Sequence, residues 1–301
     1  MRNALTIDLE DWYHPELVRH HLPASGASED EVRRTLIERS TRQLLDLLRE
    51  RGIAATFFVV GEVAQQRPQL IQAIAAQGHE VACHGMSHKP LWDMTASSFG
   101  AELDAFEALM SEVVPRADII GFRAPTFSLD NRTRWALEVL ADHGYRYDSS
   151  VFPARTPVYG VATAPLVPYH PSSQDVAAVD ERTQLVEFPM SVWPLLGWRL
   201  PVSGGFYLRA LPFGLVRHGL RQINRQRPFA VYVHPWEIQP DTPRLRLPIT
   251  SRFVTYYNIN GMLPRLTSLL DTFSFAPMRT VLEEMGKLNG LKPSEEATGC
   301  Q

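Results

Sequence analysis

The chain has 301 residues, of which 45% are hydrophobic and 21% charged, a balance typical of a globular protein that buries a core. The formal net charge is −3, so there is no strongly basic field, and we expect no nucleic-acid partner. No apolar run approaches the ~18 residues that a membrane helix needs. Asp8, Glu10 and Asp11 interrupt the N-terminus before a signal-peptide apolar region forms, so we expect a soluble cytoplasmic protein. Its two cysteines, Cys83 and Cys300, are too few for a disulfide framework, and we expect Cys83 to be buried.

Apolar, partly β-branched runs alternate with segments of helical spacing through the first half of the chain. The pattern predicts strands at residues 5–7, 53–60, 79–83, 119–122 and 145–147, and helices at residues 29–51, 69–77, 95–113 and 132–143. Gly52, Gly78 and Gly144 follow three of these helices and are suited to end them. Strand–helix alternation with short connections is typical of an α/β fold with a mostly parallel sheet.

Two segments interrupt this alternation. Residues 16–30 are predicted to form a loop, and residues 152–178, rich in proline and small polar residues, a long surface loop. Strand character resumes at residues 186–188 and 229–233. One or two helices are predicted within residues 262–288, and the residues after 291 are expected to fray.

Polar residues that can carry chemistry follow the predicted strands, where each strand ends. They are Asp8, Glu10 and Asp11 after the first strand, His84 and His88 after the third, Arg123 after the fourth, Asp148 after the fifth and His234 after a late one. In parallel sheets and barrels, active sites form at the carboxyl edge of the strands. The sequence therefore predicts that these side chains converge on one site.

The clearest metal-binding pattern is the pair His84 and His88. On one helical turn, four-residue spacing puts both imidazoles on the same face, as in many divalent-metal sites. Two imidazoles and one carboxylate leave open positions for water and substrate. Strand alternation points Asp8 and Glu10 to one side, so one carboxylate is a candidate ligand and another a candidate general base. A helix cap or a solvated turn is the alternative interpretation of these carboxylates.

Arg123 and His234 complete the set of candidate residues. Arg123 precedes a proline and is placed to hold a carboxylate bidentately and keep it ionised, or to form an ordinary structural salt bridge. His234 ends an apolar strand and is a candidate general acid if that strand reaches the same edge; a structural histidine is the alternative. His79, inside a predicted strand, is interpreted as structural.

Taken together, these motifs resemble the polysaccharide deacetylases of the NodB-homology type, carbohydrate esterase family 4. The matching stretches, in the order of the family, are Thr6-Ile7-Asp8-Leu9-Glu10-Asp11, Ala55-Thr56-Phe57-Phe58, His84-Gly85-Met86-Ser87-His88, Arg123-Ala124-Pro125, Asp148-Ser149-Ser150 and Val233-His234-Pro235. They cover about residues 4–236, and the histidine and Arg-x-Pro motifs are the most specific.

A bacterial subgroup encoded with exopolysaccharide and exosortase loci is more similar still. The stretches that resemble it are Asp8-x-Glu10-Asp11-Trp12, Ser203-Gly204-Gly205-Phe206-Tyr207, His234-Pro235-Trp236-Glu237-Ile238 and the C-terminal region from Arg252 to Leu282.

The resemblance implies a distorted (β/α) barrel of seven strands over residues 1–240, with a C-terminal helical extension at 241–301. It implies a divalent ion, Zn²⁺ first and Co²⁺ or Ni²⁺ as alternatives, bound by His84, His88 and a carboxylate. Carried over, Asp8 is the general base, Arg123 orients it, and His234 is the general acid. The family usually has two adjacent aspartates, whereas here Leu9 follows Asp8, so the third ligand is either Glu10 or Asp11.

For the substrate, the resemblance implies an N-acetylated sugar polymer or a lipid-linked oligosaccharide precursor, deacetylated by metal-assisted hydrolysis during exopolysaccharide biosynthesis. The predicted contact residues are Trp12, Phe127, Asp148, Trp193 and Trp236. Alternative functions are a deformylase or amidohydrolase of a smaller substrate, an O-acetyl esterase, or a non-catalytic carbohydrate-binding barrel. The sequence leaves the oligomeric state open.

Overall fold

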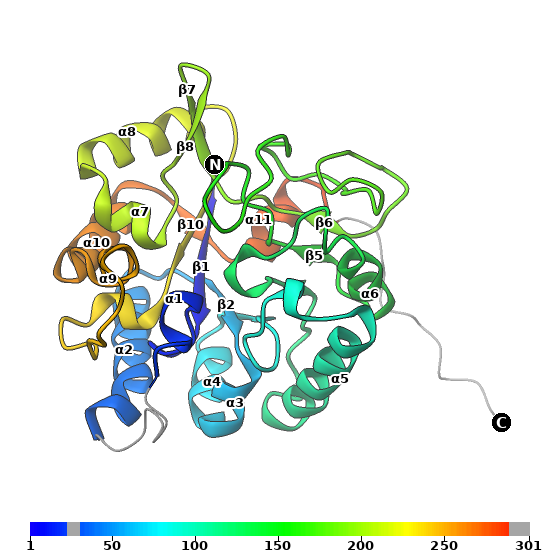
Figure 1. Cartoon of the computed structure of the whole chain (residues 1–301). Helices are drawn as coiled ribbons and strands as arrows, with labels where there is room; N and C mark the ends of the chain where they lie inside the picture. Colours follow the sequence, from blue (N-terminus) through cyan, green and yellow to red (C-terminus); the bar gives the residue numbers. More distant parts are fainter. Residues whose placement is uncertain (23–30, 289–301) are drawn as a thin grey trace.

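A computed structural model shows one parallel sheet surrounded by helices (Figure 1), and it describes residues 1–22 and 31–288. The main strands are β1 (Asn3–Leu9), β2 (Thr56–Val59), β3 (Glu80–Cys83), β4 (Gly121–Phe122), β5 (Tyr147–Asp148), β6 (Val186–Glu187) and β9 (Ala230–Val233). Their order is β9-β1-β2-β3-β4-β5-β6, and every neighbouring pair is parallel. These seven parallel strands confirm the predicted distorted (β/α) barrel, and one further short strand joins the same sheet through β1.

The barrel is completed by loop contacts between β6 and β9, which do not pair as strands within the described residues. The Ala230 N–H donates to Ser191 Oγ at 2.9 Å, and the Tyr232 N–H donates to the Ser203 carbonyl at 3.0 Å. These bonds satisfy backbone N–H groups on the edge of β9 that no strand covers. Because loop residues take the place of a pairing strand there, the barrel is distorted.

Alternation along β1 separates two apolar clusters. Leu5, Ile7 and Leu9 pack with the surrounding helices, whereas Ala4 joins the inner cluster with Phe58 of β2. Successive side chains in a strand point to opposite faces, so Thr6 and Asp8 share the inner face with Ala4. The strand thus places a hydroxyl and a carboxylate inside the barrel.

The helices of the first half lie outside the sheet. They are α2 (Glu31–Glu50), α3 (Gly61–Gln66), α4 (Pro68–Ala76), α5 (Ala96–Val113) and α6 (Ala136–Asp142). Helix α3 was not predicted: Arg67 leaves the helical conformation before Pro68, at φ −138° and ψ 55°, so one helical segment becomes two short ones. Helix α6 starts later than predicted because Thr133 closes a turn with the Asp130 N–H.

The predicted loops need correction. Residues 16–30 include a short helix, α1 (Glu16–Arg19), while residues 23–30 lie outside the description. Residues 152–178 contain no helix or strand, as predicted, but they do not simply cover the surface. Phe152, Tyr169 and Val176 are buried, and Tyr169 forms a β-bridge with Glu187.

The second half holds more regular structure than predicted. Its elements are the antiparallel hairpin β7 (Val192–Leu195) and β8 (Trp198–Pro201), helices α7 (Gly205–Ala210), α8 (Phe213–Asn224), α9 (Ile249–Tyr256), α10 (Met262–Thr272) and α11 (Met278–Glu284), and strand β10 (Phe275–Ala276). Among the described residues, 3₁₀ turns lie at Leu91–Asp93 and Pro125–Phe127 in the first half and at Pro235–Ile238 and Ile259–Gly261 in the second.

The helices predicted within residues 262–288 are present as α10 and α11, but β10 lies between them and pairs with β1. The C-terminal segment therefore contributes to the main sheet. The expected fraying after residue 291 and Cys300 fall outside the described residues. None of the described helices is both long and apolar enough to cross a membrane.

Candidate active site

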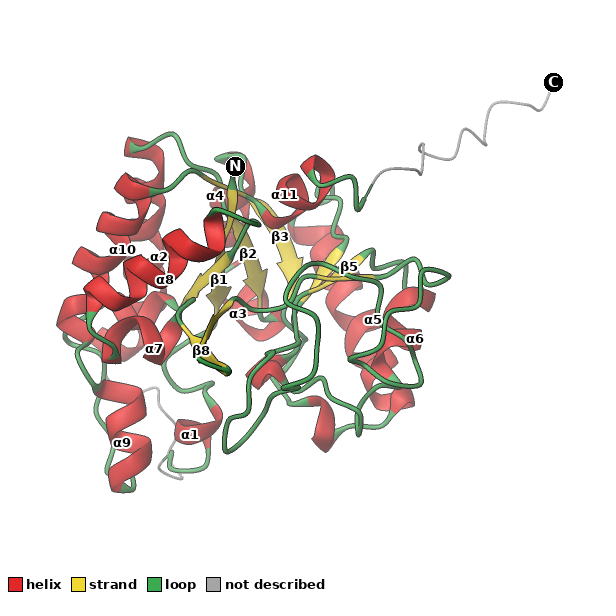
Figure 2. Cartoon of the chain, turned by 90° about the horizontal axis from the view of Figure 1, so that it is seen from above, coloured by secondary structure: helices red, strands yellow, loops and turns green. Residues whose placement is uncertain are grey.

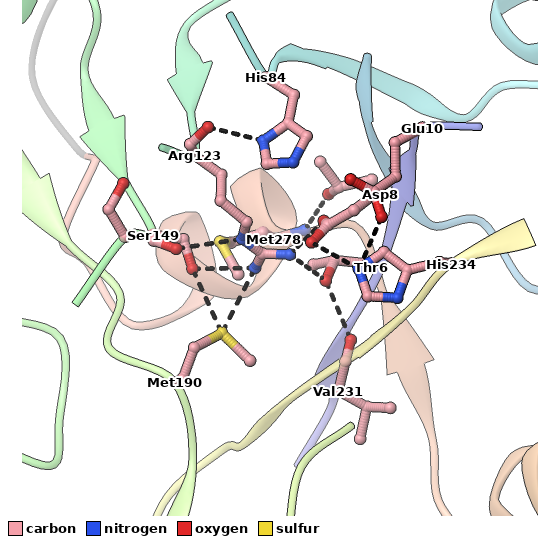
Figure 3. Close-up of polar contacts among 12 residues, drawn as sticks. Thr6, Asp8, Glu10, His84, Arg123, Ser149, Met190, Val231, His234 and Met278 are labelled. Carbon is pink, nitrogen blue, oxygen red and sulfur yellow. Dashed lines mark hydrogen bonds and ion pairs between the residues drawn. The ribbon is translucent and has the colours of Figure 1, made fainter. Parts of the chain in front are cut away.

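An arginine inside the barrel holds the carboxylate of Asp8 (Figure 3). Arg123, which is fully buried, donates from Nη1 to Asp8 Oδ1 at 2.6 Å and to Thr6 Oγ1 at 2.8 Å. Its Nε and Nη2 donate to the carbonyl and hydroxyl of Ser149, and its guanidinium lies 4.1 Å from the centre of the Phe58 ring. The predicted bidentate grip is wrong, because only Nη1 reaches Asp8. The remaining donors fix the guanidinium, which leaves Asp8 Oδ2 free of Arg123.

Glu10, His84 and His88 form a group of buried potential metal ligands. Their ligand atoms lie within 4.8 Å of one another, and Glu10 Oε2 is 2.5 Å from His88 Nε2. His84 Nδ1 lies 2.7 Å from the Arg123 carbonyl, which can only accept a hydrogen bond. Nδ1 must therefore carry the proton, so the lone pair of His84 is on Nε2, as in metal-ligating histidines.

The histidine pair lies on a loop, which corrects the predicted helical turn. Strand β3 ends at Cys83, and His88 itself has a positive φ of 55°. Glu102 of α5 holds this loop: its Oε2 accepts hydrogen bonds from the Met86 and Ser87 N–H groups, both at 3.0 Å. A carboxylate on the next helix, rather than helical geometry, sets the approach of the two imidazoles.

The electrostatics of this group suit a divalent cation. Burial lowers the pKa of His84 to about 4, so its imidazole is neutral at pH 7. Burial acts to raise the pKa of Glu10, but the charges of His88 and His234 outweigh it and hold that pKa well below its ordinary value. A neutral imidazole and an ionised carboxylate are the forms that bind metal.

Asp11 lies outside the ligand group. Its Oδ1 accepts from the Trp12 N–H at 2.8 Å, and its own N–H donates to His14 Nδ1 at 2.9 Å. Burial raises the pKa of Asp11 to about 6, opposed by its bond to Trp12 and the charge of His14. Its carboxylate thus stabilises the turn after β1, while Glu10 lies with the two imidazoles.

His234 lies near the carboxylates of Asp8, in β1, and of Glu10, just after it. Its Nε2 is 3.5 Å from Glu10 Oε1 and 3.9 Å from Asp8 Oδ2, and its ring stacks on Trp236 at a centroid distance of 5.4 Å. Its side chain is 18% exposed, against 4% or less for Asp8, Glu10 and His88, so it is the most accessible of these four.

Glu237 contacts the Nδ1 side of the His234 ring, and Arg209 binds Glu237 in turn. Neither residue was given a role from the sequence. His234 Nδ1 lies 2.8 Å from Glu237 Oε2, and Arg209 Nε donates to Glu237 Oε1 at 2.8 Å. Burial acts to lower the pKa of His234, but Glu10 and Glu237 raise it to about 9. Burial acts to raise the pKa of Glu237, but Arg209 and His234 lower it to about 2. A carboxylate three residues after a candidate acid was a usable signal for Glu237; Arg209, on α7, had no local signal.

The predicted substrate residues are mostly covered. Trp12, Phe127 and Asp148 are at most 7% exposed, and Trp193 is half-buried against His218. Trp236 lies closest to the chemistry, because its Nε1 donates to Glu10 Oε1 at 3.2 Å. These placements give the aromatic rings little open face, and their contact with substrate stays a prediction.

The fold and the site together define an α/β barrel with a carboxylate–His–His centre at the carboxyl edge of its strands. Residues 28–147 match the family model described as polysaccharide deacetylase, and residues 149–283 match a domain of unknown function, DUF3473. The chain therefore carries a polysaccharide deacetylase domain of the NodB type, followed by a DUF3473 region.

Curated relatives match one part of the chain. A chitooligosaccharide deacetylase from Sinorhizobium fredii is 39% identical over 85 residues, which are 28% of this chain and 40% of that protein. A peptidoglycan-N-acetylmuramic acid deacetylase from Bacillus subtilis is 31% identical over 85 residues, 28% of this chain and 32% of that protein. The chain thus spans less than half the length of these relatives.

Two solved structures share the fold over most of their length. A probable polysaccharide deacetylase from Pseudomonas aeruginosa PAO1 has a TM-score of 0.60 at 14% identity and covers 96% of this chain and 92% of its own. The Puue allantoinase has a TM-score of 0.59 at 13% identity, and the match covers 96% of this chain and 91% of the allantoinase. At this identity the likeness concerns the barrel and not its reaction.

Proposed function

We propose that this protein is a metal-dependent deacetylase that removes N-acetyl groups from an amino-sugar polymer or from its lipid-linked precursor. The observation that carries the proposal is the convergence of Glu10, His84 and His88 with Asp8 and His234 at one end of the barrel. The partial relatives, a chitooligosaccharide deacetylase and a peptidoglycan-N-acetylmuramic acid deacetylase, agree with an N-acetylated substrate.

In this proposal Glu10, His84 and His88 hold the metal, with Zn²⁺ first and Co²⁺ or Ni²⁺ as alternatives. The donor set fits, because two imidazole nitrogens and one carboxylate are typical of catalytic zinc sites. The Nδ1 of His84 is already bonded to the Arg123 carbonyl, as expected of an oriented ligand. A bound ion would polarise the acetyl carbonyl and lower the pKa of a water.

Asp8 and His234 move the protons. Asp8 Oδ2, the oxygen that Arg123 leaves free, accepts a proton from the attacking water. Water oxygen bonds to the acetyl carbon, the C–N bond breaks, and His234 Nε2 protonates the departing nitrogen. The products are acetate and a free amino sugar. Arg123 orients Asp8 through Oδ1, and Glu237 favours the protonated form of His234 that the proposed acid needs.

The biological setting of the proposal is exopolysaccharide biosynthesis. It is supported by the resemblance of the stretches around Trp12, Tyr207 and Ile238 to the exosortase-associated subgroup. The proposed cytoplasmic location places the enzyme with a lipid-linked precursor rather than with exported polymer.

Acetate release from a panel of N-acetylated oligosaccharides, measured on metal-stripped protein before and after adding Zn²⁺, Co²⁺ or Ni²⁺, tests the proposal. We expect release that requires metal and is lost in His84→Ala. Glu10→Gln should lose metal binding, and Asp11→Asn, one residue away and equally buried in a turn, is its matched control and should retain it.

The same panel separates the alternatives. Release only from O-acetylated sugars would mark an esterase, and turnover only of small amides or formamides would mark a small-substrate amidohydrolase. Stoichiometric metal and oligosaccharide binding without release of any acyl group would overturn the enzymatic proposal in favour of a carbohydrate-binding barrel.

A further inference from the structure

Helix α9 and the residues just before and after it form an exposed surface of apolar and basic side chains. This α9 surface consists of Arg244, Arg246, Ile249, Arg252, Phe253 and Tyr257. Ile249 is 89% exposed, Phe253 49% and Tyr257 42%. Residues four apart share a face of a helix, so Ile249 and Phe253 present neighbouring apolar groups to the outside. Most apolar residues of the chain are buried, and so this outward face needs an explanation.

The sequence segment that contains α9 carries charge of one sign. The sequence contains no aspartate or glutamate between Asp241 and Asp271, but it contains four arginines there, in a chain of net charge −3. Within the part of the chain that the structure describes, no carboxylate lies within ion-pair distance of Arg244, Arg246 or Arg252. The α9 surface is therefore a local positive patch on an acidic protein.

This surface is close to the candidate active site. Arg209 donates to the Val254 carbonyl of α9 at 2.9 Å and also to the Tyr257 carbonyl, and the same guanidinium binds Glu237 beside His234. Figure 2 shows α9 next to α1 on the side of the molecule toward which β1 and β2 point. The patch and the catalytic edge of the barrel therefore face the same side.

We propose that the α9 surface docks on the headgroup region of an anionic lipid bilayer. Interfacial helices combine apolar side chains, which enter the acyl boundary, with arginines that contact anionic headgroups. Stacking on a sugar ring needs an open aromatic face, whereas the Phe253 ring packs against Phe206 and Tyr257. The most exposed side chain of the α9 surface, Ile249, is aliphatic. Positive charge beside separate apolar groups therefore favours a bilayer over a sugar polymer.

Docking of this kind does not depend on the proposed deacetylase activity, so the two can fail separately. Where that activity holds, a docked enzyme presents His234 to glycans attached to the membrane through a lipid. Binding to vesicles and turnover of soluble oligosaccharide are then two independent measurements of one protein.

Co-sedimentation of the full chain with phosphatidylcholine vesicles, with and without phosphatidylglycerol, tests the docking. We expect binding that requires phosphatidylglycerol and weakens with added salt. Replacing Arg244, Arg246 and Arg252 together by glutamine should weaken it about a hundredfold, since each arginine near an anionic surface contributes a factor of about five. Ile249→Ser should also weaken it, and because that side chain packs against almost nothing, the fold and the turnover of soluble substrate should be unchanged.

Val179→Ser is the matched control. Val179 is 52% exposed, like the residues of the α9 surface, but it precedes Asp180 and Glu181 rather than a group of arginines. It should bind vesicles as the wild type does. Absence of binding to phosphatidylglycerol vesicles, equal binding by the triple arginine variant, or binding to an anionic polysaccharide but not to vesicles would overturn the proposal.

Discussion

Replacing Glu237 by glutamine removes the negative charge behind His234 while keeping the shape of the side chain. Glu237 Oε2 lies 2.8 Å from His234 Nδ1, and hydrogen bonds to charged groups contribute about 1.5–3 kcal/mol. Since a pKa shift of one unit corresponds to about 1.36 kcal/mol, the pKa of His234 should fall by roughly one to two units from its value of about 9. The proposed acid is active when protonated, so the alkaline limb of kcat/KM should move to lower pH by the same amount.

The pH dependence of kcat/KM for acetate release is the assay, with thermal unfolding measured in parallel. Glu237→Gln also leaves buried Arg209 without its carboxylate, which costs stability on the order of 3 kcal/mol. Arg209→Gln is the matched control, because it breaks the same ion pair but leaves Glu237 on His234. We expect Arg209→Gln to lose comparable stability and keep its alkaline limb. An alkaline limb that stays in place in Glu237→Gln, or shifts equally in both variants, would refute the role given to Glu237.

Two further predictions concern buried groups away from the metal ligands. The Nδ1 of His79 accepts a hydrogen bond from the Ala55 N–H, and burial lowers the pKa of His79 to about 4. Because this folded-state pKa lies below the ordinary 6.5, the contribution of His79 to stability is present above pH 6.5 and is lost as the pH falls towards 4. The free energy of unfolding of His79→Gln, measured with urea, should lack this loss, which is at most about 3 kcal/mol. Equal dependence of the unfolding free energy on pH in the two proteins would contradict the prediction. Burial and the neighbouring Asp148 raise the pKa of Glu187 well above its ordinary 4.5, so its contribution to stability is full below pH 4.5 and falls as the pH rises. Glu187→Gln should therefore gain stability relative to the wild type between pH 4.5 and 7, by up to about 3 kcal/mol. A stability difference that does not vary with pH would count against the raised pKa of Glu187.

The parts of the fold that the sequence predicted well are those in which pattern and burial coincide. Strands β2 and β9 lie within continuous apolar runs because both of their faces are buried. The six-residue helix α3 is too short to show a period. The β7–β8 hairpin turns through Leu196 and Gly197, at φ 50° and 82°, and a leucine in the left-handed region gives no turn signal.

The site was predictable wherever strand topology alone decides proximity. Parallel strands bring their carboxyl ends to one edge, which is why Asp8, His84 and His234 could be grouped from the sequence. The choice between Glu10 and Asp11 depends on the turn after β1, where the Asp11 carboxylate bonds the next N–H instead of facing the imidazoles. The local sequence does not show whether Glu10 or Asp11 faces the imidazoles, because either carboxylate can follow the end of the strand.

No sequence pattern could predict the contacts between residues distant in sequence that position His234. Arg209 precedes its partner Glu237 by 28 residues and binds carbonyl groups of Val254 and Tyr257 as well. Arg265 of α10 donates to the Arg209 carbonyl at 2.8 Å, so the segment after residue 240 holds the helix that carries this guanidinium. Through Arg209 and Glu237, the position of His234 depends on residues well beyond the strand that it follows. Since β10 also pairs with β1, the C-terminal segment supports both the sheet and the proposed acid, and we infer that barrel and extension act as one unit in catalysis.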